Sequence, residues 1–336
     1  MEKYKCEVPV LIKIWTRLRQ QKEQFEIIKK VKPYILFLVS DGGRNDEEWE
    51  NINKNRKMIL DGIDWDCHIY RLFEDDNLGL YTMDKKAVQY VWSKVDRCIL
   101  LEDDIIPSES FFYFCEDVLE RYINDTRVSY VTGTNLKGIY EDVQADYFFC
   151  PGGSISGIAS WKRVYDTFYQ FPYKDDSYVF NLLLKQIPYT RTGLKKQVID
   201  FALKEYSGQY PAGDEFFYGL SRFGQNQLCI TPKKNLVRNA GDNKESAHYD
   251  EKKYLPKAIQ RTVGMQTYEI EFPMKHPQYV IPDFGYADYL DKVFGRAPIR
   301  QVFRKAEHIA RVVILGGPLE VIYRIKRKKN RIKKER

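Results

Sequence analysis

The chain has 336 residues, which is enough for one large core or for a core with a smaller lobe attached. Hydrophobic residues make up 43% and aromatic residues 15%, a composition that excludes a disordered or fibrous protein. The formal net charge of +7 is confined to Leu319–Arg336, where nine Lys and Arg residues stand against two Glu, so the rest of the chain is neutral overall. This distribution argues against nucleic acid as a partner and favours one local anionic contact.

Cysteine usage and the N-terminus bear on the compartment. The six cysteines are scattered, with no CxxC pair and no Cys/His cluster of zinc spacing, and most lie in apolar runs. This pattern is typical of a reducing compartment. Val8–Trp15 is too short for a signal peptide and is interrupted by Lys13, and no run of about 20 apolar residues is present to span a bilayer. We therefore expect a cytoplasmic protein.

The N-terminal part of the chain, as far as Asn135, alternates short apolar runs with amphipathic segments. Strands are predicted where β-branched and aromatic residues gather, over Val8–Ile14, Tyr34–Val39, Cys67–Phe73, Arg97–Leu101 and Val128–Val131. Helices are predicted between them, over Lys22–Lys32, Asp46–Leu60, Lys85–Lys94 and a segment that Ser108 should cap. This order is typical of parallel strands joined by crossover helices, hence of an α/β fold.

The pattern changes after Phe149, beginning with the breaker cluster Pro151–Ser154. Further helices are predicted over Trp161–Phe168, Val179–Lys185, Asp214–Phe223 and from Ile299 onward, with a short strand at Leu228–Ile230. Gly316-Gly317-Pro318 should end the last helix. We expect three parts: residues 1–150, residues 151–295 as the other half of the same domain, and residues 296–336 as an amphipathic helix with a basic tail.

The strongest local signal is the segment LLEDDIIP, in which Glu102, Asp103 and Asp104 directly follow a buried strand. In an open α/β sheet, ligands bind at the carboxyl ends of the strands. Three adjacent carboxylates repel one another unless a cation neutralises them, and oxygen ligands suit Mg²⁺ or Mn²⁺. Such an ion would bridge a diphosphate and stabilise the charge of a departing leaving group. A solvated acidic turn is the competing interpretation, and the motif alone does not decide between them.

Together with its neighbours, this segment has a family resemblance. Asn77-Leu78-Gly79 and the stretch from Arg97 to Asn135 resemble bacterial nucleotide-sugar transferases of the GT-A fold, related to the N-acetylglucosaminyltransferase I type. The similarity extends upstream to Pro9-Val10 and Ser40-Asp41-Gly42. Downstream it extends to GIASWKRVYDTF, GDEFFYGLSRFG and NLVRNAGDNKESAHYD, so it covers roughly residues 8 to 250.

The resemblance implies a Rossmann-like GT-A fold, with a mixed, mostly parallel sheet and helices on both faces. Residues 1–150 would form the nucleotide-sugar-binding half and residues 151–295 the acceptor half. Within the first half, Asp41 would contact the uracil or ribose, and Asn77 and Gly79 would line the nucleotide pocket. Lys85 or Lys86 stands where the family has an arginine, and a lysine can neutralise phosphate as a point charge.

The resemblance also assigns the metal and the acids around it. Glu102 and Asp103 would face the nucleoside and the donor sugar, and Asp104 would bind Mn²⁺ or Mg²⁺. His248 matches a histidine that often completes the metal or diphosphate site in GT-A enzymes. A single histidine is otherwise more often a surface or core residue than a ligand, although neutral imidazole is a common metal ligand.

An inverting transferase needs a carboxylate that takes the proton from the acceptor hydroxyl during attack at the anomeric carbon. Asp214-Glu215 lies where the family has a Trp-Asp element at the start of a helix. Asp214 is the first choice for this catalytic base and Glu215 the second. The competing interpretation is that both are first-turn acids stabilised only by the helix dipole.

The basic run from Arg324 to Arg336 follows an amphipathic segment and several apolar residues. A solvated, frayed terminus is the usual interpretation of such a run. Polybasic segments next to a short apolar face also bind anionic membrane surfaces reversibly. We expect this second role, with the protein peripheral on the inner face of a bacterial plasma membrane.

These observations predict a metal-dependent glycosyltransferase, inverting by resemblance, that moves a sugar from a UDP-sugar or another NDP-sugar to a glycan or lipid-linked saccharide acceptor. The product would be a bacterial surface polysaccharide, capsule or lipopolysaccharide. Two alternatives remain open. One is a sugar nucleotidyltransferase, for which Asp41-Gly42-Gly43-Arg44 would be a thin triphosphate loop, and the other is a non-catalytic, membrane-tethered glycan-binding protein of the same fold.

Overall fold

The computed structural model describes most of the chain. The described residues are 5–168, 175–187, 195–196, 198–199, 218–219, 222–241, 252–294 and 298–334, with side chains of the last helix described from Ile299 to Arg324. All six cysteines lie in these ranges and are free thiols.

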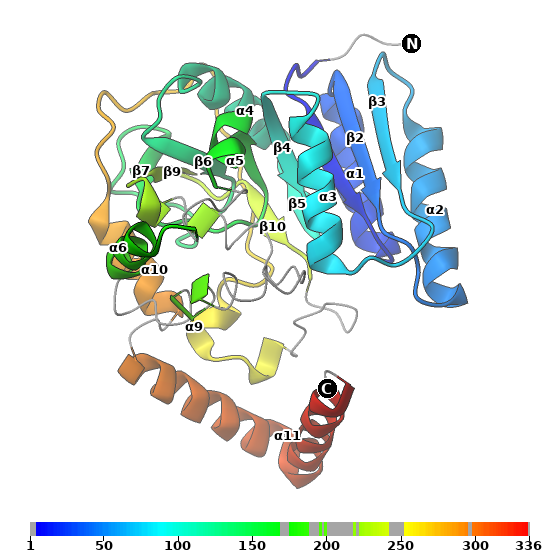
Figure 1. The fold of residues 1–336 in the computed structure, drawn as a ribbon, viewed down its shortest axis with the longest axis vertical. Coiled ribbons are helices and arrows are strands. Elements are labelled where there is room, and N and C mark those ends of the chain that lie inside the picture. Colours follow the sequence, from blue (N-terminus) through cyan, green and yellow to red (C-terminus); the bar gives the residue numbers. More distant parts are fainter. Residues whose placement is uncertain are drawn as a thin grey trace.

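An eight-stranded sheet forms the centre of the fold, in the order β3-β2-β1-β4-β8-β6-β9-β7 (Figure 1). Its strands are β1 (Val10–Ile14), β2 (Ile35–Ser40), β3 (His68–Phe73), β4 (Arg97–Leu101), β6 (Val128–Thr132), β7 (Tyr147–Cys150), β8 (Ile158–Trp161) and β9 (Leu228–Pro232). The neighbours among β3, β2, β1 and β4 pair in parallel, as do β6 and β9, whereas β8 and β7 run antiparallel to their partners. The expected mixed, mostly parallel α/β sheet is therefore confirmed.

Helices cover both faces of the parallel part. They are α1 (Leu18–Val31), α2 (Asp46–Gly62), α3 (Leu80–Trp92) and α4 (Glu109–Arg121). Lys13 on β1 pairs in register with Val39 on β2, so the two share a face, and Lys13 forms an ion pair with Asp84 on α3. Helix α1 packs against α2 and α4 instead, and Figure 1 shows α1 and α3 on opposite sides of the sheet. Because both faces are covered, the strands are near-continuous apolar runs such as VLIKI and RCILL.

Several predicted elements need correction. The segment Trp161–Phe168 was predicted as one helix, but Trp161 ends strand β8 and only α5 (Lys162–Phe168) is helical. Ser108 does precede α4, yet its side chain makes no capping hydrogen bond to the helix, and the Ser108 backbone N–H donates to Leu236 O at 2.7 Å. The start of α4 is therefore held by a hydrogen bond to a segment distant in the sequence, and not by a capping side chain.

A short two-stranded sheet was not predicted from the sequence. Its strands are β5 (Ile105–Pro107) and β10 (Val237–Asn239), which pair antiparallel. β5 begins directly after the acidic turn, so this pairing ties the turn to a segment in the second half of the chain.

The second half adds helices around the far end of the sheet, namely α6 (Ser177–Gln186), η3 (Lys252–Tyr254), α9 (Lys257–Gln260) and α10 (Phe284–Phe294). A satellite core links α10 to the sheet through Leu136, Tyr140, Phe148, Tyr286 and Leu290. The expected C-terminal helix is α11 (Pro298–Lys334). Its geometry is interrupted at Gly317, at φ 70°, as the Gly-Gly-Pro signal predicted, but a second helical segment follows where only a tail was expected.

Among the described residues, no helix combines the length and the apolar composition that crossing a bilayer requires.

Candidate active site

The acidic turn lies at the carboxyl edge of the parallel strands. Strands β1 and β4 are neighbours, with Ile12 opposite Leu101, so the residues that follow each strand meet at one edge. Ile105 N–H donates to Glu102 O at 3.1 Å, which closes the turn, and Gln24 Nε2 on α1 donates to both Glu102 O and Ile105 O at 2.7 Å. These contacts to backbone atoms hold the turn in place and leave its carboxylates available.

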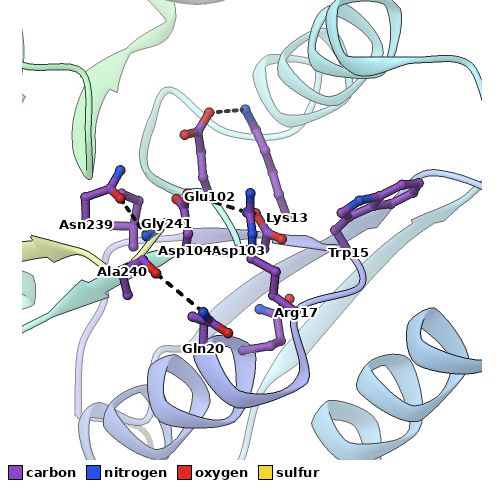
Figure 2. Close-up of polar contacts among 12 residues, drawn as sticks. Lys13, Trp15, Arg17, Gln20, Glu102, Asp103, Asp104, Asn239, Ala240 and Gly241 are labelled. Atoms are coloured by element: carbon purple, nitrogen blue, oxygen red, sulfur yellow. Dashed lines mark hydrogen bonds and ion pairs between the residues drawn. The ribbon is translucent and has the colours of Figure 1, made fainter. Parts of the chain in front are cut away.

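Arg17, which immediately precedes α1, meets the two aspartates of this turn (Figure 2). Its Nη1 donates to Asp103 Oδ1 and lies 3.4 Å from Asp104 Oδ2. All three residues are buried, with exposed fractions of 7–8%. One guanidinium therefore serves two buried carboxylates, and the pair of acids keeps a net negative charge.

Three polar atoms of this cluster are buried without a partner: Asp103 Oδ2, Asp104 Oδ1 and Arg17 Nε. A buried carboxylate oxygen with no hydrogen bond is costly, so it usually marks a place where a ligand, water or ion completes the site. Burial raises the pKa of Asp103 to about 7 in spite of the opposing charge of Arg17, and burial also raises the pKa of Asp104. At both carboxyl groups the desolvation caused by burial outweighs the favourable charge of Arg17.

Gly241 leaves space next to Asp104. A Cβ atom at this position would lie 2.3 Å from Asp104 Oδ2, so no larger residue fits without displacing the carboxylate. Asn239 Oδ1 accepts a hydrogen bond from Gly241 N–H at 2.8 Å, and Ala240 N–H donates to Asp104 O at 2.8 Å. The end of β10 therefore lies against the acidic turn and adds an amide oxygen to its surroundings, as Figure 2 shows.

The donor atoms fit a hard divalent cation. Within the described part of the chain, no group of three or more His, Cys, Asp and Glu side chains is arranged to hold a metal. Mg²⁺ in phosphate-transferring sites, however, is bound by one or two carboxylates together with substrate phosphates and water. Asp104, with one buried oxygen that has no partner, meets that requirement, and Asp103 offers a second such oxygen.

Asp41, predicted to contact the base or ribose, follows β2 and organises a neighbouring loop. Its Oδ1 accepts from the N–H groups of Gly42 and Leu78 at 2.9 and 2.8 Å, and its Oδ2 accepts from Gly79 N–H and Asn77 Nδ2 at 3.0 and 3.2 Å. Four donors therefore converge on one buried carboxylate. The structure therefore brings Asp41, Asn77 and Gly79 together, and the Asp41 side chain holds the loop.

Gly79 is the residue in this loop that requires glycine. It adopts φ 79°, a left-handed conformation, and it immediately precedes α3. Asn77 Nδ2 also donates to Gly42 O at 2.8 Å, so the loop is tied to the end of β2 at two places.

The lysines and Glu102 form a more exposed border. Lys13 on β1 forms ion pairs with Asp84 on α3 and with Glu102, the latter at 3.5 Å. Lys86 on α3 is paired with Glu74 at 2.6 Å, and Lys85 lies one residue earlier on the same helix. Glu102 keeps 41% of its side chain exposed, unlike the two aspartates beside it.

Three predicted site residues lie outside the described residues. These are the candidate bases Asp214 and Glu215 and the candidate ligand His248. Their assignments stay predictions.

Sequence reasoning missed Arg17, Lys13, Asn239 and Gly241. The signal for the first two was weak but present, since KIWTR places two cations at the carboxyl end of the first predicted strand. Asn239 and Gly241 gave no local signal, because their place beside Asp104 depends on the β5–β10 pairing.

No family model matches the sequence, and no curated protein matches it. Among solved structures, the chain is similar to the mannosyltransferase PcManGT from Pyrobaculum calidifontis in complex with GDP-Man and Mn²⁺, with 11% identity over 66% of this chain and 70% of that chain, at a TM-score of 0.36. It is also similar to HddC from Yersinia pseudotuberculosis, with 10% identity over 48% of this chain and 80% of that chain, at a TM-score of 0.30. We draw no functional argument from similarities of this strength.

Proposed function

We propose that this chain is a glycosyltransferase that takes its sugar from a nucleotide-sugar donor, with a UDP-sugar as the first choice and another NDP-sugar as the second. The observation that carries the proposal is the edge where β1, β2 and β4 end. It places the loop held by Asp41 and the buried Asp103–Asp104 pair at the same carboxyl end of a parallel sheet. That edge is where α/β sheets bind nucleotides.

Each residue at this edge of the sheet would have a separate role. The loop Asn77–Gly79, ordered by Asp41, would line the nucleotide pocket. Asp104, with Asp103 beside it, would hold Mn²⁺ or Mg²⁺, which when bound acts as a Lewis acid on the donor diphosphate. Arg17 balances part of the charge of both acids and fixes their orientation from α1. Glu102, half-exposed, would face the donor sugar.

The acceptor side of the proposal rests on the family resemblance. We propose an inverting reaction in which Asp214, or else Glu215, takes the proton from the acceptor hydroxyl. The acceptor would be a glycan or a lipid-linked saccharide, and the product a bacterial surface polysaccharide made at the cytoplasmic face of the plasma membrane. His248 would complete the metal or diphosphate site.

A sugar nucleotidyltransferase is the less favoured candidate, because the glycines of the loop it would need are packed against other residues. A Cβ atom on Gly42 would lie 2.5 Å from the Asp76 backbone, and one on Gly43 would lie 2.9 Å from the Trp49 ring. Arg44 of the same loop forms an exposed ion pair with Glu48. A non-catalytic glycan-binding protein would keep the same fold but show no turnover.

Donor hydrolysis tests the proposal. The parent protein with Mn²⁺ should hydrolyse a UDP-sugar slowly and release UDP. A nucleotidyltransferase would instead release pyrophosphate from a nucleoside triphosphate, and a binding protein would catalyse neither reaction. Asp104→Ala should abolish both hydrolysis and the Mn²⁺-dependent rise in melting temperature with UDP. Asp61→Ala is the matched control, because Asp61 is an exposed acid paired with Lys57 near the end of α2, and it should behave as the parent. If Asp104→Ala hydrolyses the donor normally, the proposed metal site is wrong.

The base assignment needs a separate experiment. Asp214→Asn should retain donor binding in a thermal-shift assay and lose transfer to an acceptor, while Glu215→Gln should transfer. The reverse result would exchange the two roles, and normal transfer by both variants would refute the assignment.

A further inference from the structure

The first segment of α11 carries an apolar stripe that points away from the protein. Six large apolar side chains on this stripe are 50–78% exposed: Ile299, Val302, Phe303, Ile309, Val313 and Ile314. They recur at spacings of three, four and seven residues, and exposed Ala306 and Ala310 fall between them, so all lie along one side of the helix.

The opposite side of α11 faces the protein through several polar residues and the buried Val312. Arg304 Nη2 donates to the carbonyl oxygens of Lys292 and Val293 at 3.1 Å. Glu307 Oε1 accepts from Lys257 N–H at 2.8 Å. These contacts fix which side of the helix faces α9 and α10.

Two further contacts join the same polar side to η3. His308 Nδ1 lies 3.0 Å from Tyr254 O, and Arg311 Nη1 donates to Lys253 O at 3.3 Å. The apolar stripe therefore faces outward because the polar residues of α11 are bound to the protein.

This orientation is the reverse of that of an ordinary surface helix, which turns its apolar stripe toward the core. A contiguous exposed apolar face of this kind marks an interaction surface. Figure 1 shows α11 at one end of the molecule, as two helical segments that meet at an angle.

Charges identify the partner. Arg300 and Lys305 are exposed and lie, by helical spacing, on opposite borders of the stripe. Beyond the break at Gly317, Leu319, Ile322 and Tyr323 are exposed as well, and the sequence then adds the basic run that accounts for the whole net charge. An apolar stripe bordered by cations is the pattern of a helix that lies in a membrane interface, with long basic side chains reaching the headgroups.

We propose that α11 is an in-plane membrane anchor, in which the stripe from Ile299 to Ile314 inserts among lipid acyl chains and the basic run binds anionic headgroups. The polar contacts described above hold the protein body on that surface in one orientation. The anchor does not depend on the proposed transferase activity, and donor hydrolysis in solution reports on the active site separately.

Vesicle flotation with the full-length protein tests the anchor. The parent should bind vesicles of phosphatidylcholine mixed with phosphatidylserine and should bind pure phosphatidylcholine much more weakly. Replacing Phe303 and Val313 by Asp in one variant should weaken binding to the mixed vesicles by about tenfold or more, because two apolar contacts are lost and two negative charges are added. Donor hydrolysis should be unchanged in this variant.

Two controls keep the result interpretable. Phe303→Leu keeps an apolar side chain on the stripe and should bind as the parent. Replacing Tyr279 and Ile281 by Asp in one variant adds the same two charges at exposed apolar residues outside α11, and it should also bind as the parent. Equal loss in the Tyr279→Asp, Ile281→Asp variant would show a general charge effect and overturn the proposal.

A second measurement tests whether the stripe binds another copy of the chain instead of a membrane. Light scattering should show the same oligomeric state for the parent and for the Phe303→Asp, Val313→Asp variant. A dimer that the variant dissociates, together with unchanged vesicle binding, would assign the stripe to a second copy of the chain and refute the membrane anchor. Unchanged vesicle binding by the variant would refute it in any oligomeric state.

Discussion

Replacing Arg17 by leucine should destabilise the protein strongly and make it more responsive to divalent metal. The Arg17 guanidinium lies between Asp103 and Asp104, and the three residues are more than nine-tenths buried. Removing one partner from a buried ion pair costs about 3–5 kcal/mol, because the remaining charge is left uncompensated. A protein of this size has about 5–15 kcal/mol of stability, so we expect the variant to remain folded.

The pH dependence of that loss follows from the carboxylates. Without Arg17 the pKa values of both acids rise further, so at low pH they protonate and avoid part of the cost. As pH rises the native state must hold two charged acids, and the loss of stability should therefore be larger at pH about 8 than at pH about 6.

Urea unfolding followed by tryptophan fluorescence measures these effects, first in EDTA and then in Mn²⁺. Because a bound ion would supply the missing positive charge, Mn²⁺ should stabilise Arg17→Leu more than it stabilises the parent. Ligand linkage gives a gain of about 2.7 kcal/mol when the free ion is at 100 times its Kd. The matched control is Arg97→Leu, which removes the partly exposed partner of the exposed Glu120 and should cost about 1 kcal/mol or less.

Two results would refute this reasoning. If Arg17→Leu lowers the free energy of unfolding by no more than about 1 kcal/mol at pH about 8, the Arg17 ion pair is worth no more than an exposed one. Asp103 and Asp104 would then not depend on the guanidinium. A large loss that Mn²⁺ does not reduce would mean that the acids do not bind the ion.

Two further substitutions probe the site. Gly241→Ala should weaken Mn²⁺-dependent thermal stabilisation by about tenfold in Kd, or about 1.4 kcal/mol, because the new methyl group would displace the Asp104 carboxylate; an unchanged titration would exclude Gly241 from the metal site. Gly79→Ala should lower the free energy of unfolding by about 1 kcal/mol, since alanine is strained at φ 79°, and it should reduce UDP affinity in calorimetry. The Gly79 prediction fails if UDP affinity is retained while stability falls, which would leave that loop outside the nucleotide pocket.

The parallel half of the fold was predictable from the sequence because strands of five or six residues alternate regularly with amphipathic helices of 13 to 17 residues. The Arg97–Leu101 strand was predicted with its observed bounds, and the other strands predicted before Asn135 differ only slightly at their ends. The antiparallel strands were harder. Tyr147–Cys150 and Ile158–Trp161 are very short, and so short an apolar run does not distinguish a strand from the start of a helix.

The candidate site was predictable in part, for a similar reason. The acids after β4 are contiguous in sequence, so their position at a strand end could be inferred. Their neighbours could not, because Arg17 and Gly241 are both distant along the chain from the carboxylates that they approach. Such contacts arise from sheet order and from the β5–β10 pairing, and one sequence carries no local signal for either.

The place of β8 in the sheet has a consequence for biosynthesis. β8 lies between β4 and β6, although both of those strands precede it in the chain. Until β8 has been synthesised, β4 and β6 therefore each have an edge whose backbone groups lack their final partner. Early chaperone engagement on this stretch would protect it from joining another nascent chain until Trp161 emerges from the exit tunnel.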